Sequence, residues 1–471
     1  MVLVAAGLSF SQTLPTAKSI AAEMTLAWNL GNSMESTGGP TNWGNPMPTQ
    51  ALIDSVKAEG FNTIRIPCAW DANADQNTHV ISASWMAQVK TVVDYCIKDS
   101  LFVILNIHWD GGWLEKNIDA SVTNATLRQT ISAKQGAYWR QIATAFKNYD
   151  RHLLFASANE PNLTDTSLYV ASMKVLNSFH QIFIDSVRAT GGNNASRTLV
   201  IQGPNADIAN TNRLMTTLPT DKSTSGRIMA EVHFYPYQFC LMTADANWGN
   251  QFYYWGKGNH STTDAAHNAT WGEESWTDSM FNLMKTQFVD KNIPVVLGEF
   301  GAMKRLTLTG NNLALHLKSR LYWYKYVVGS AKARGLIPVP WDAGGKGDGT
   351  MSVIDRATNG VFDQDLLTAL RTGAGLPAVR VATTSLAARI PEATGLQATV
   401  SNGSIHVAYP AEESGKVQVT VTNLLGETLW SGSANAQTGT NTFNLPVTQR
   451  GLTVLRIQQG NHSQQVKVYC P

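Results

Sequence analysis

Cysteine is scarce in this chain, and neither sign of charge is in real excess. The four cysteines lie too far apart for a metal-ligand motif or a disulfide framework, although a Cys68–Cys96 bridge stays open at this stage. The 36 basic and 34 acidic side chains are interspersed and leave a formal net charge of +2. A nucleic-acid partner would require a sustained positive field, so we expect none. Because no apolar run reaches the length of a membrane span, we expect no span either.

The chain is long and rich in tryptophan. Its 471 residues and 43% hydrophobic content predict a large catalytic body with an accessory module. Several of the 14 tryptophans fall in Gly- and Asn-rich loops, and sugar rings stack on indole faces. Residues 2–10 resemble the apolar part of a signal peptide without its basic start. We therefore expect residues 1–12 to be a leader remnant or an N-terminal extension, and the protein to be secreted.

Eight apolar runs that read as buried strands alternate with helical patterns. One helical pattern covers residues 51–56 and stops at Gly60, and a second has Ser84 as its expected N-cap. Alternation of this kind predicts an α/β fold with a parallel sheet, and no Gly-rich phosphate loop follows the first strand. We therefore predict a (β/α)₈ TIM barrel over residues 13–371. The expected strands are 26–30, 63–67, 102–107, 153–157, 199–202, 228–233, 294–299 and 336–341.

The texture of the sequence changes after Arg371. Residues 372–395 are small and Thr/Ser-rich, which predicts a linker. Residues 396–471 then show short runs with partial alternation and turns between them, which predicts a small all-β sandwich of Ig-like type. The expected strands are 396–400, 404–409, 417–422, 428–431, 441–445, 453–457 and 465–469.

Two glutamates follow apolar runs directly. Asn159-Glu160-Pro161 and Gly298-Glu299-Phe300-Gly301 each end an expected strand. Glycoside hydrolysis needs one carboxylic acid to protonate the leaving oxygen and one carboxylate at the anomeric carbon, so a pair on rigid elements is the minimal machinery. Active-site groups of such barrels project from the carboxyl ends of the strands. Further polar or aromatic residues lie at or just past these ends: Asn32, Arg65, His108, His233, Tyr235 and Trp341.

Taken together and in order, these motifs make residues 23–371 resemble glycoside hydrolase family 5, and most of all its subfamily 4. The resemblance implies a retaining hydrolase of β-linked glucans, with Glu160 as acid/base, Glu299 as nucleophile, and no metal or other cofactor. The matching segments include Trp28-Asn29-Leu30-Gly31-Asn32, Gly60-Phe61-Asn62-Thr63-Ile64-Arg65-Ile66-Pro67, Ile104-Leu105-Asn106-Ile107-His108, Val232-His233-Phe234-Tyr235 and Pro340-Trp341-Asp342.

The supporting residues have expected roles. Arg65 and Tyr235 should contact Glu299 and favour its charged form, whereas Glu160 should lie near His233 and be less acidic. Asn159 follows from adjacency and resemblance as the donor to the sugar 2-hydroxyl. We expect His108 to bind the reacting sugar and Trp341 to form its platform, with core packing as the alternative for both.

Other residues leave two interpretations open. Asn32 and Glu35 resemble ligands of the next sugar, but Glu35 is equally compatible with a solvated loop charge. Trp109 stands where relatives often have a second histidine, and it either stacks on sugar or packs beneath its loop. Core packing and sugar stacking are equally weighted for five more tryptophans: Trp43, Trp70, Trp113, Trp248 and Trp255.

The leading hypothesis is a monomeric, secreted, retaining endo-β-1,4-glucanase acting on cellulose-like and mixed-linkage β-glucan, with xyloglucan as a further substrate. β-Mannanase, xylanase or dedicated xyloglucanase activity on the same machinery is the close alternative. A non-catalytic glycan-binding protein would be expected to lack one carboxylate, and a metal-dependent hydrolase would need paired His/Asp ligands. The C-terminal module weakly resembles sorting or Ig-like domains of secreted glycosidases. Because its few aromatics sit at strand positions, we favour an accessory or export role over glycan binding.

Overall fold

The structure is a computed structural model that describes residues 13–222, 225–377, 395–401, 404–411, 413–423, 428–446, 451–460 and 462–470. The chain divides into two compact units, residues 1–379 and 380–471, and each is described by itself. Residues 1–12 and 378–394 lie outside the described residues, so the predicted leader and most of the predicted linker stay predictions.

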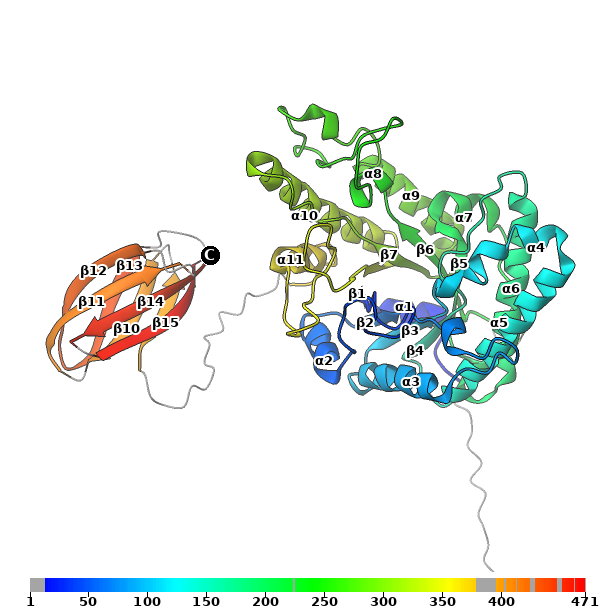
Figure 1. Ribbon diagram of the computed structural model, residues 1–471, viewed down its shortest axis with the longest axis horizontal. Helices are drawn as coiled ribbons and strands as arrows, with labels where there is room; N and C mark the ends of the chain where they lie inside the picture. Colours follow the sequence, from blue (N-terminus) through cyan, green and yellow to red (C-terminus); the bar gives the residue numbers. More distant parts are fainter. Residues whose placement is uncertain are drawn as a thin grey trace, which may run out of the picture. The chain divides into compact units, whose positions relative to one another are not determined.

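Unit one is a barrel of eight parallel strands in sequence order (Figure 1). The barrel closes between its first and last strands, where the Gly31 amide just after the first strand donates to the Asp342 carbonyl just after the last at 3.1 Å. All eight expected strands are present and the predicted (β/α)₈ barrel is confirmed. The strands are β1 (Ala27–Asn29), β2 (Thr63–Ile66), β3 (Phe102–Asn106), β4 (Leu153–Ala156), β5 (Leu199–Asp207), β6 (Ile228–Phe234), β7 (Val295–Phe300) and β8 (Leu336–Pro340).

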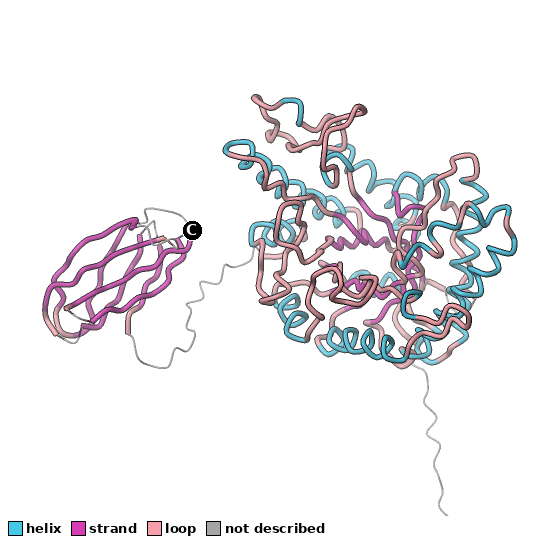
Figure 2. The backbone as a smooth tube through the Cα atoms, viewed as in Figure 1, coloured by secondary structure: helices cyan, strands magenta, loops and turns pink. Residues whose placement is uncertain are grey.

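Helices surround the strands, as the colours of Figure 2 show. The second expected helix begins two residues earlier than predicted, because Ser82 and not Ser84 caps it and accepts from the Trp85 amide. The helices are α1 (Ala17–Glu23), α2 (Gln50–Ala58), α3 (Ala83–Lys98), α4 (Ala120–Thr123), α5 (Ala125–Ala145), α6 (Tyr169–Ala189), α7 (Ile208–Leu214), α8 (Tyr237–Cys240), α9 (Glu274–Gln287), α10 (Gly310–Ala333) and α11 (Gln364–Gly373).

Apolar side chains fill the barrel interior. Ile104, Leu154 and Val296 from three strands form one buried cluster with Ile20 and Met24 of α1 and its C-cap. The strands are buried on both faces because the helices pack on their outer side, which explains their continuous apolar runs. The interior and the end of the barrel that contacts α1 are therefore apolar. The polar side chains of the site lie at the carboxyl ends of the strands.

Three cysteines of unit one carry free thiols. Cys68, Cys96 and Cys240 are fully buried, and desolvation raises the pKa of each thiol. The open possibility of a Cys68–Cys96 bridge is therefore wrong. These residues behave as small apolar side chains of the core.

Unit two consists of two antiparallel sheets, ordered β13-β10-β9 and β12-β11-β14-β15. Side chains of both sheets, among them Val407 and Val419, share one core, so the predicted β-sandwich is confirmed. Tyr409 is buried in that core, Trp430 and Phe443 pack against it, and Tyr469 is exposed. The strands are β9 (Gln397–Ser401), β10 (Ser404–Ala411), β11 (Gly415–Thr422), β12 (Thr428–Ala436), β13 (Gly439–Pro446), β14 (Gly451–Gln459) and β15 (His462–Cys470).

Among the residues described here, no helix combines the length and the apolar character that crossing a membrane requires.

Candidate active site

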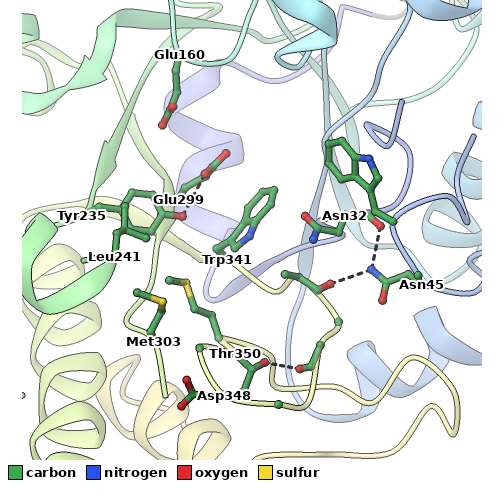
Figure 3. Close-up of a pocket in the computed structure, with 18 residues that line it drawn as sticks. Asn32, Asn45, Glu160, Tyr235, Leu241, Glu299, Met303, Trp341, Asp348 and Thr350 are labelled. Atoms are coloured by element: carbon green, nitrogen blue, oxygen red, sulfur yellow. Dashed lines mark hydrogen bonds between the residues drawn. The ribbon is translucent and has the colours of Figure 1, made fainter. Parts of the chain in front are cut away.

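A cavity of about 660 Å³ opens at the carboxyl ends of the barrel strands. Glu160 enters it from the loop after β4, and Glu299 enters it from β7 (Figure 3). Both carboxyl groups face the same space, with Trp341 beside Glu299. The structure therefore brings together the two glutamates that the sequence predicts.

Arg65 donates hydrogen bonds to three side chains of the site. Its Nη1 donates to Glu299 Oε1 at 2.9 Å and to Asn29 Oδ1 at 3.0 Å, and its Nη2 donates to Asn159 Oδ1 at 2.8 Å. The Tyr235 hydroxyl donates to the other oxygen of Glu299 at 3.2 Å. The contacts expected for Arg65 and Tyr235 are thus present. Because the Asn159 oxygen is engaged by Arg65, its amide nitrogen is the group left to donate elsewhere.

Glu231 is a buried partner of these groups that sequence reasoning missed. Its Oε1 lies 2.8 Å from Arg65 Nε and 3.3 Å from His233 Nε2. A Cβ on residue 298 would fall 2.0 Å from the same oxygen, so glycine before Glu299 is required by packing. The available signal was a lone carboxylate inside the apolar strand β6, two residues before His233 and hence on the same face.

His233 joins the two carboxyl groups. Its Nδ1 lies 2.7 Å from Glu160 Oε1 and 3.8 Å from Glu299 Oε2. Burial alone would lower the pKa of His233, but the neighbouring carboxylates Glu299, Glu160 and Glu231 outweigh burial and raise it to about 10. At neutral pH the ring is therefore an imidazolium that donates from both nitrogens.

The two carboxyl pKa values move in directions opposite to those expected. Burial opposes ionisation at both, but the His233 hydrogen bond and charge lower the pKa of Glu160. At the enclosed Glu299, burial outweighs the charges of His233 and Arg65 and raises its pKa. The sequence showed neither how deeply Glu299 is buried nor that the His233 ring beside Glu160 is charged. Since the three groups are in contact, they titrate as a unit, and the His233 proton is one hydrogen bond away from Glu160.

Glu115 is a second residue that sequence reasoning missed. It is 4% exposed, and its Oε1 accepts from the Glu160 amide at 2.6 Å. Burial raises the pKa of Glu115 to about 7, although this hydrogen bond opposes the shift. Glu115 follows a tight Gly-rich segment after β3 and carries no motif of its own, so only the packed structure reveals that it holds the Glu160 backbone.

The raised pKa of Glu115 predicts a pH dependence of stability. An unfolded glutamate titrates near 4.5, so between that pH and about 7 the folded protein keeps a proton that the unfolded chain loses. The contribution is fully present below pH 4.5 and is lost as pH rises through 7. We expect the Glu115→Gln variant, which cannot ionise, to lose less unfolding free energy than the wild type between pH 5 and pH 8. Denaturant titration at both pH values measures the free energy of unfolding. Glu413→Gln, at an exposed residue of unit two, is the control and should lose as much stability as the wild type. If Glu115→Gln also loses as much as the wild type, the raised pKa of Glu115 is contradicted.

The remaining sugar-binding candidates differ in their environment. His108 and Trp341 stack with centroids 6.0 Å apart, and burial with the Arg65 charge keeps the pKa of His108 well below 6.5, so its ring is neutral. Asn32 lines the cavity, and Asn45 donates to its carbonyl at 2.9 Å. Their proposed contacts with sugar stay predictions.

Glu35 is 3% exposed, so its interpretation as a solvated loop charge is wrong. Its two carboxyl oxygens accept from the backbone amides of Asn32 and Ser33. Burial raises the pKa of Glu35 to about 7 despite these hydrogen bonds. The structure thus gives Glu35 the role of holding the loop that presents Asn32, and direct contact with sugar stays a prediction.

The tryptophans divide by burial. Trp70 and Trp255 are completely buried and donate to backbone carbonyls, which makes them core residues. Trp43 is exposed and lines the 660 Å³ cavity. Trp113 is half-buried edge-on against the Tyr138 ring. Trp248 is 67% exposed and does not line the 660 Å³ cavity.

Trp109 is 40% exposed, so its interpretation as packing beneath the loop is wrong. Its stacking on sugar stays a prediction.

A metal ion is chemically conceivable between Glu160, His233 and Glu299, because one ligand atom of each lies within 4.8 Å of the others. The charges already present argue against it. The Arg65 guanidinium contacts Glu299 and His233 is itself cationic, so a divalent ion would meet two positive groups in the same small space.

Chelation tests the predicted absence of a metal requirement. We expect prolonged dialysis against EDTA to leave the hydrolysis rate within about twofold of the untreated enzyme, since Arg65 and His233 supply the positive charge that a metal would otherwise bring. Loss of activity that returns on adding a divalent cation would overturn this expectation.

Comparison with known proteins agrees with the geometry. The model of the cellulase family, glycosyl hydrolase family 5, matches residues 29–347. Endoglucanase A of Paenibacillus barcinonensis is 36% identical over 383 residues, covering 76% of this chain and 90% of that protein. A solved xyloglucan-specific β-1,4-glucanase from a ruminal metagenomic library shares 39% identity at a TM-score of 0.71, over 78% of this chain and 98% of that one. A broad-specificity endoglucanase of subfamily 4 from Bacteroides salanitronis shares 32% identity at a TM-score of 0.67, over 78% and 98%.

The matched region contains both glutamates and the barrel strands from the end of β1 through β8, so the resemblance stated from the motifs is confirmed. The chain belongs to glycoside hydrolase family 5, in which it is an endo-β-glucanase.

Proposed function

We propose that the chain hydrolyses internal β-1,4 bonds of glucans with retention of configuration, Glu299 acting as nucleophile and Glu160 as acid/base. The observation that carries the proposal is the close approach of the two carboxyl groups, an oxygen of each lying within 4.8 Å of the other. Retaining enzymes hold these groups about 5–5.5 Å apart, whereas inverting enzymes need about 6.5–9.5 Å to admit a water.

In the first step, Glu299 attacks the anomeric carbon while Glu160 protonates the departing oxygen. Arg65 and Tyr235 fix the Glu299 carboxylate at 2.9 and 3.2 Å, which orients one lone pair toward the sugar. Glu160 takes up the proton across its 2.7 Å hydrogen bond with His233 and then delivers it. The glycosidic bond breaks, and an ester between the sugar and Glu299 forms.

In the second step, water opens that ester. Esterification removes the negative charge of Glu299, so Glu160 is the remaining carboxylate next to the anomeric carbon. It takes a proton from the attacking water, and its partly exposed side chain, 44% accessible, allows water to approach. The Asn159 amide is placed to donate to the 2-hydroxyl in both steps, since Arg65 holds its oxygen.

The lining of the cavity suits a glucan chain and leaves space beside it for side branches. Trp341 and Trp43 offer aromatic faces, and a glycine-rich wall from residues 343–351 carries few bulky side chains. Such space is compatible with branched xyloglucan as well as with linear or mixed-linkage glucan. One solved relative is xyloglucan-specific and another has broad specificity. We propose action on several β-1,4-glucans, outside the cell where polymeric substrates occur; mannan and xylan are the close alternatives.

Product release from purified polysaccharides tests this proposal. We expect carboxymethyl cellulose, mixed-linkage β-glucan and xyloglucan to yield oligosaccharides of several lengths, and glucomannan or xylan to be cut more slowly. Preferred cleavage of xylan or mannan would overturn the substrate class. No release from any polymer would favour a glycan-binding protein.

A further inference from the structure

Glu231 is a fully buried glutamate that no step of the proposed reaction uses. It lies on β6 and does not line the 660 Å³ cavity. Its Oε1 nevertheless lies between two cations, 2.8 Å from Arg65 Nε and 3.3 Å from His233 Nε2. A carboxylate is costly to bury unless paired charges and hydrogen bonds compensate. These two cations are therefore the partners through which Glu231 can act.

Each of the two cations contacts one catalytic carboxyl group with its other nitrogens. Arg65 Nη1 donates to Glu299 at 2.9 Å. His233 Nδ1 lies 2.7 Å from Glu160 Oε1. One oxygen of Glu231 is thus linked through a single residue to the proposed nucleophile, and through another single residue to the proposed acid/base.

The second oxygen of Glu231 is linked to the backbone that leads to Glu160. Gln202 on β5 donates from Nε2 to Glu231 Oε2 at 2.6 Å, and its Oε1 accepts from the Ala158 amide at 2.9 Å. Ala158 stands two residues before Glu160. Since both oxygens of Glu231 accept from donors, the group is an ionised carboxylate.

The charge of Glu231 is part of a balance among five buried or half-buried groups, which we call the charge cluster. Arg65 and the His233 imidazolium are positive, Glu231 and Glu299 are negative, and Glu160 is neutral when it is ready to protonate the leaving oxygen. Burial opposes ionisation of Glu231, but the charges of Arg65 and His233 outweigh it and lower its pKa. Without Glu231 the charge cluster gains one net positive charge, which favours ionised carboxyl groups and a neutral imidazole.

Three further ionisable groups face the charge cluster. Burial and the neighbouring cations keep the pKa of His108 well below 6.5, so its ring is neutral. Burial raises the pKa of the Tyr235 hydroxyl and raises that of Glu115 to about 7. All three remain in a protein that lacks only Glu231, so they cancel when such a variant is compared with the wild type.

We propose that Glu231 is a positioning residue for the reaction. Through Arg65 it holds the carboxylate of Glu299 in place. It also keeps His233 charged, so that this ring donates to Glu160. The inference rests on the proposed function, since it assigns Glu231 a part in the same two steps.

The pH profile of kcat/KM on mixed-linkage β-glucan separates this role from a merely structural one. Burial and the other charges act on the pKa values of Glu299, Glu160 and His233, and Glu231 adds a rise to each. Glu231→Gln keeps the size of the side chain and removes its charge. We therefore expect both the acid and the alkaline limb to move by about one pH unit or more to lower pH. A merely structural role would lower the rate at every pH and leave both limbs in place.

Glu231→Asp is the matched control, because it shortens the side chain by one methylene and keeps the charge. It should lose rate while both limbs stay close to those of the wild type. Limbs that stay at the wild-type pH in Glu231→Gln would overturn the proposal. Limbs that move equally far in Glu231→Asp would overturn it as well, since the charge would then not be the cause.

Nitrogen-15 NMR of labelled histidine tests the same role without any substrate, with His233 assigned by its absence from His233→Asn. We expect both ring nitrogens of wild-type His233 to carry protons at pH 8, and the ring of Glu231→Gln to lose its charge at least about one pH unit lower than the wild type. A neutral ring in the wild type at pH 8 would overturn the proposal even if Glu231→Gln fails to fold. If the wild type cleaves no glucan, the proposed function fails, whereas the titration of His233 still decides the role of Glu231, so the two failures are distinguishable.

Discussion

Replacing Glu299 by Gln is expected to lower kcat on β-glucan by at least about 10⁴-fold, because an amide cannot form the glycosyl ester. The substitution keeps the size of the side chain: its amide oxygen can still accept from Arg65, and its amide nitrogen can donate to the Tyr235 hydroxyl oxygen. The loss therefore reports chemistry and not a collapsed site. Reducing-sugar release over long incubations measures it.

Glu413→Gln is the matched control, since it makes the same chemical change at an exposed residue of unit two. It should retain full activity. If a preparation of Glu299→Gln that is free of contaminating enzyme keeps more than about one hundredth of the wild-type activity, Glu299 is not the nucleophile.

Replacing Glu160 by Ala is expected to produce a loss that depends on the leaving group. On β-glucan, whose leaving hydroxyl needs a proton, we expect kcat/KM to fall by about 10²–10⁴-fold. A dinitrophenyl cellobioside needs no such proton, so its kcat/KM should fall far less. Its kcat should nevertheless drop, because no base remains to activate water against the Glu299 ester.

Azide tests this division of labour, since it attacks the ester without losing a proton. Adding azide to Glu160→Ala should restore turnover of the dinitrophenyl substrate and yield a β-glycosyl azide. Azide should not restore turnover in Glu299→Gln. Equal losses on both substrates, with no azide effect, would contradict the role of Glu160.

The barrel and its two glutamates were predictable because their signals are local. Each strand is a short apolar run, and each glutamate ends such a run or follows it closely. Because the carboxyl ends of all eight strands meet at one end of the barrel, both glutamates were expected there. The contact of His233 with Glu160 was also expected, and the structure has it. The contacts of Glu115 and Glu231 were not predictable in the same way: Glu115 reaches the Glu160 amide across 45 residues, and Glu231 pairs with Arg65 from inside an apolar strand.

The pKa directions failed for a related physical reason. They depend on how deeply each carboxyl group is buried and on which one accepts the hydrogen bond from His233, and neither quantity has a sequence pattern. Glu35 shows the same limit: the sequence left a sugar ligand and a solvated loop charge equally open, and packing buries the carboxyl group against backbone amides.

The configuration of the newly formed reducing end tests the central claim most directly. Proton NMR of cello-oligosaccharide hydrolysis, recorded within the first minutes, distinguishes the α- and β-anomers before mutarotation mixes them. Double displacement through Glu299 predicts that the β-anomer appears first and the α-anomer grows in later. Initial appearance of the α-anomer would show single displacement by water and would contradict the assignment of Glu299 and Glu160 as a retaining pair.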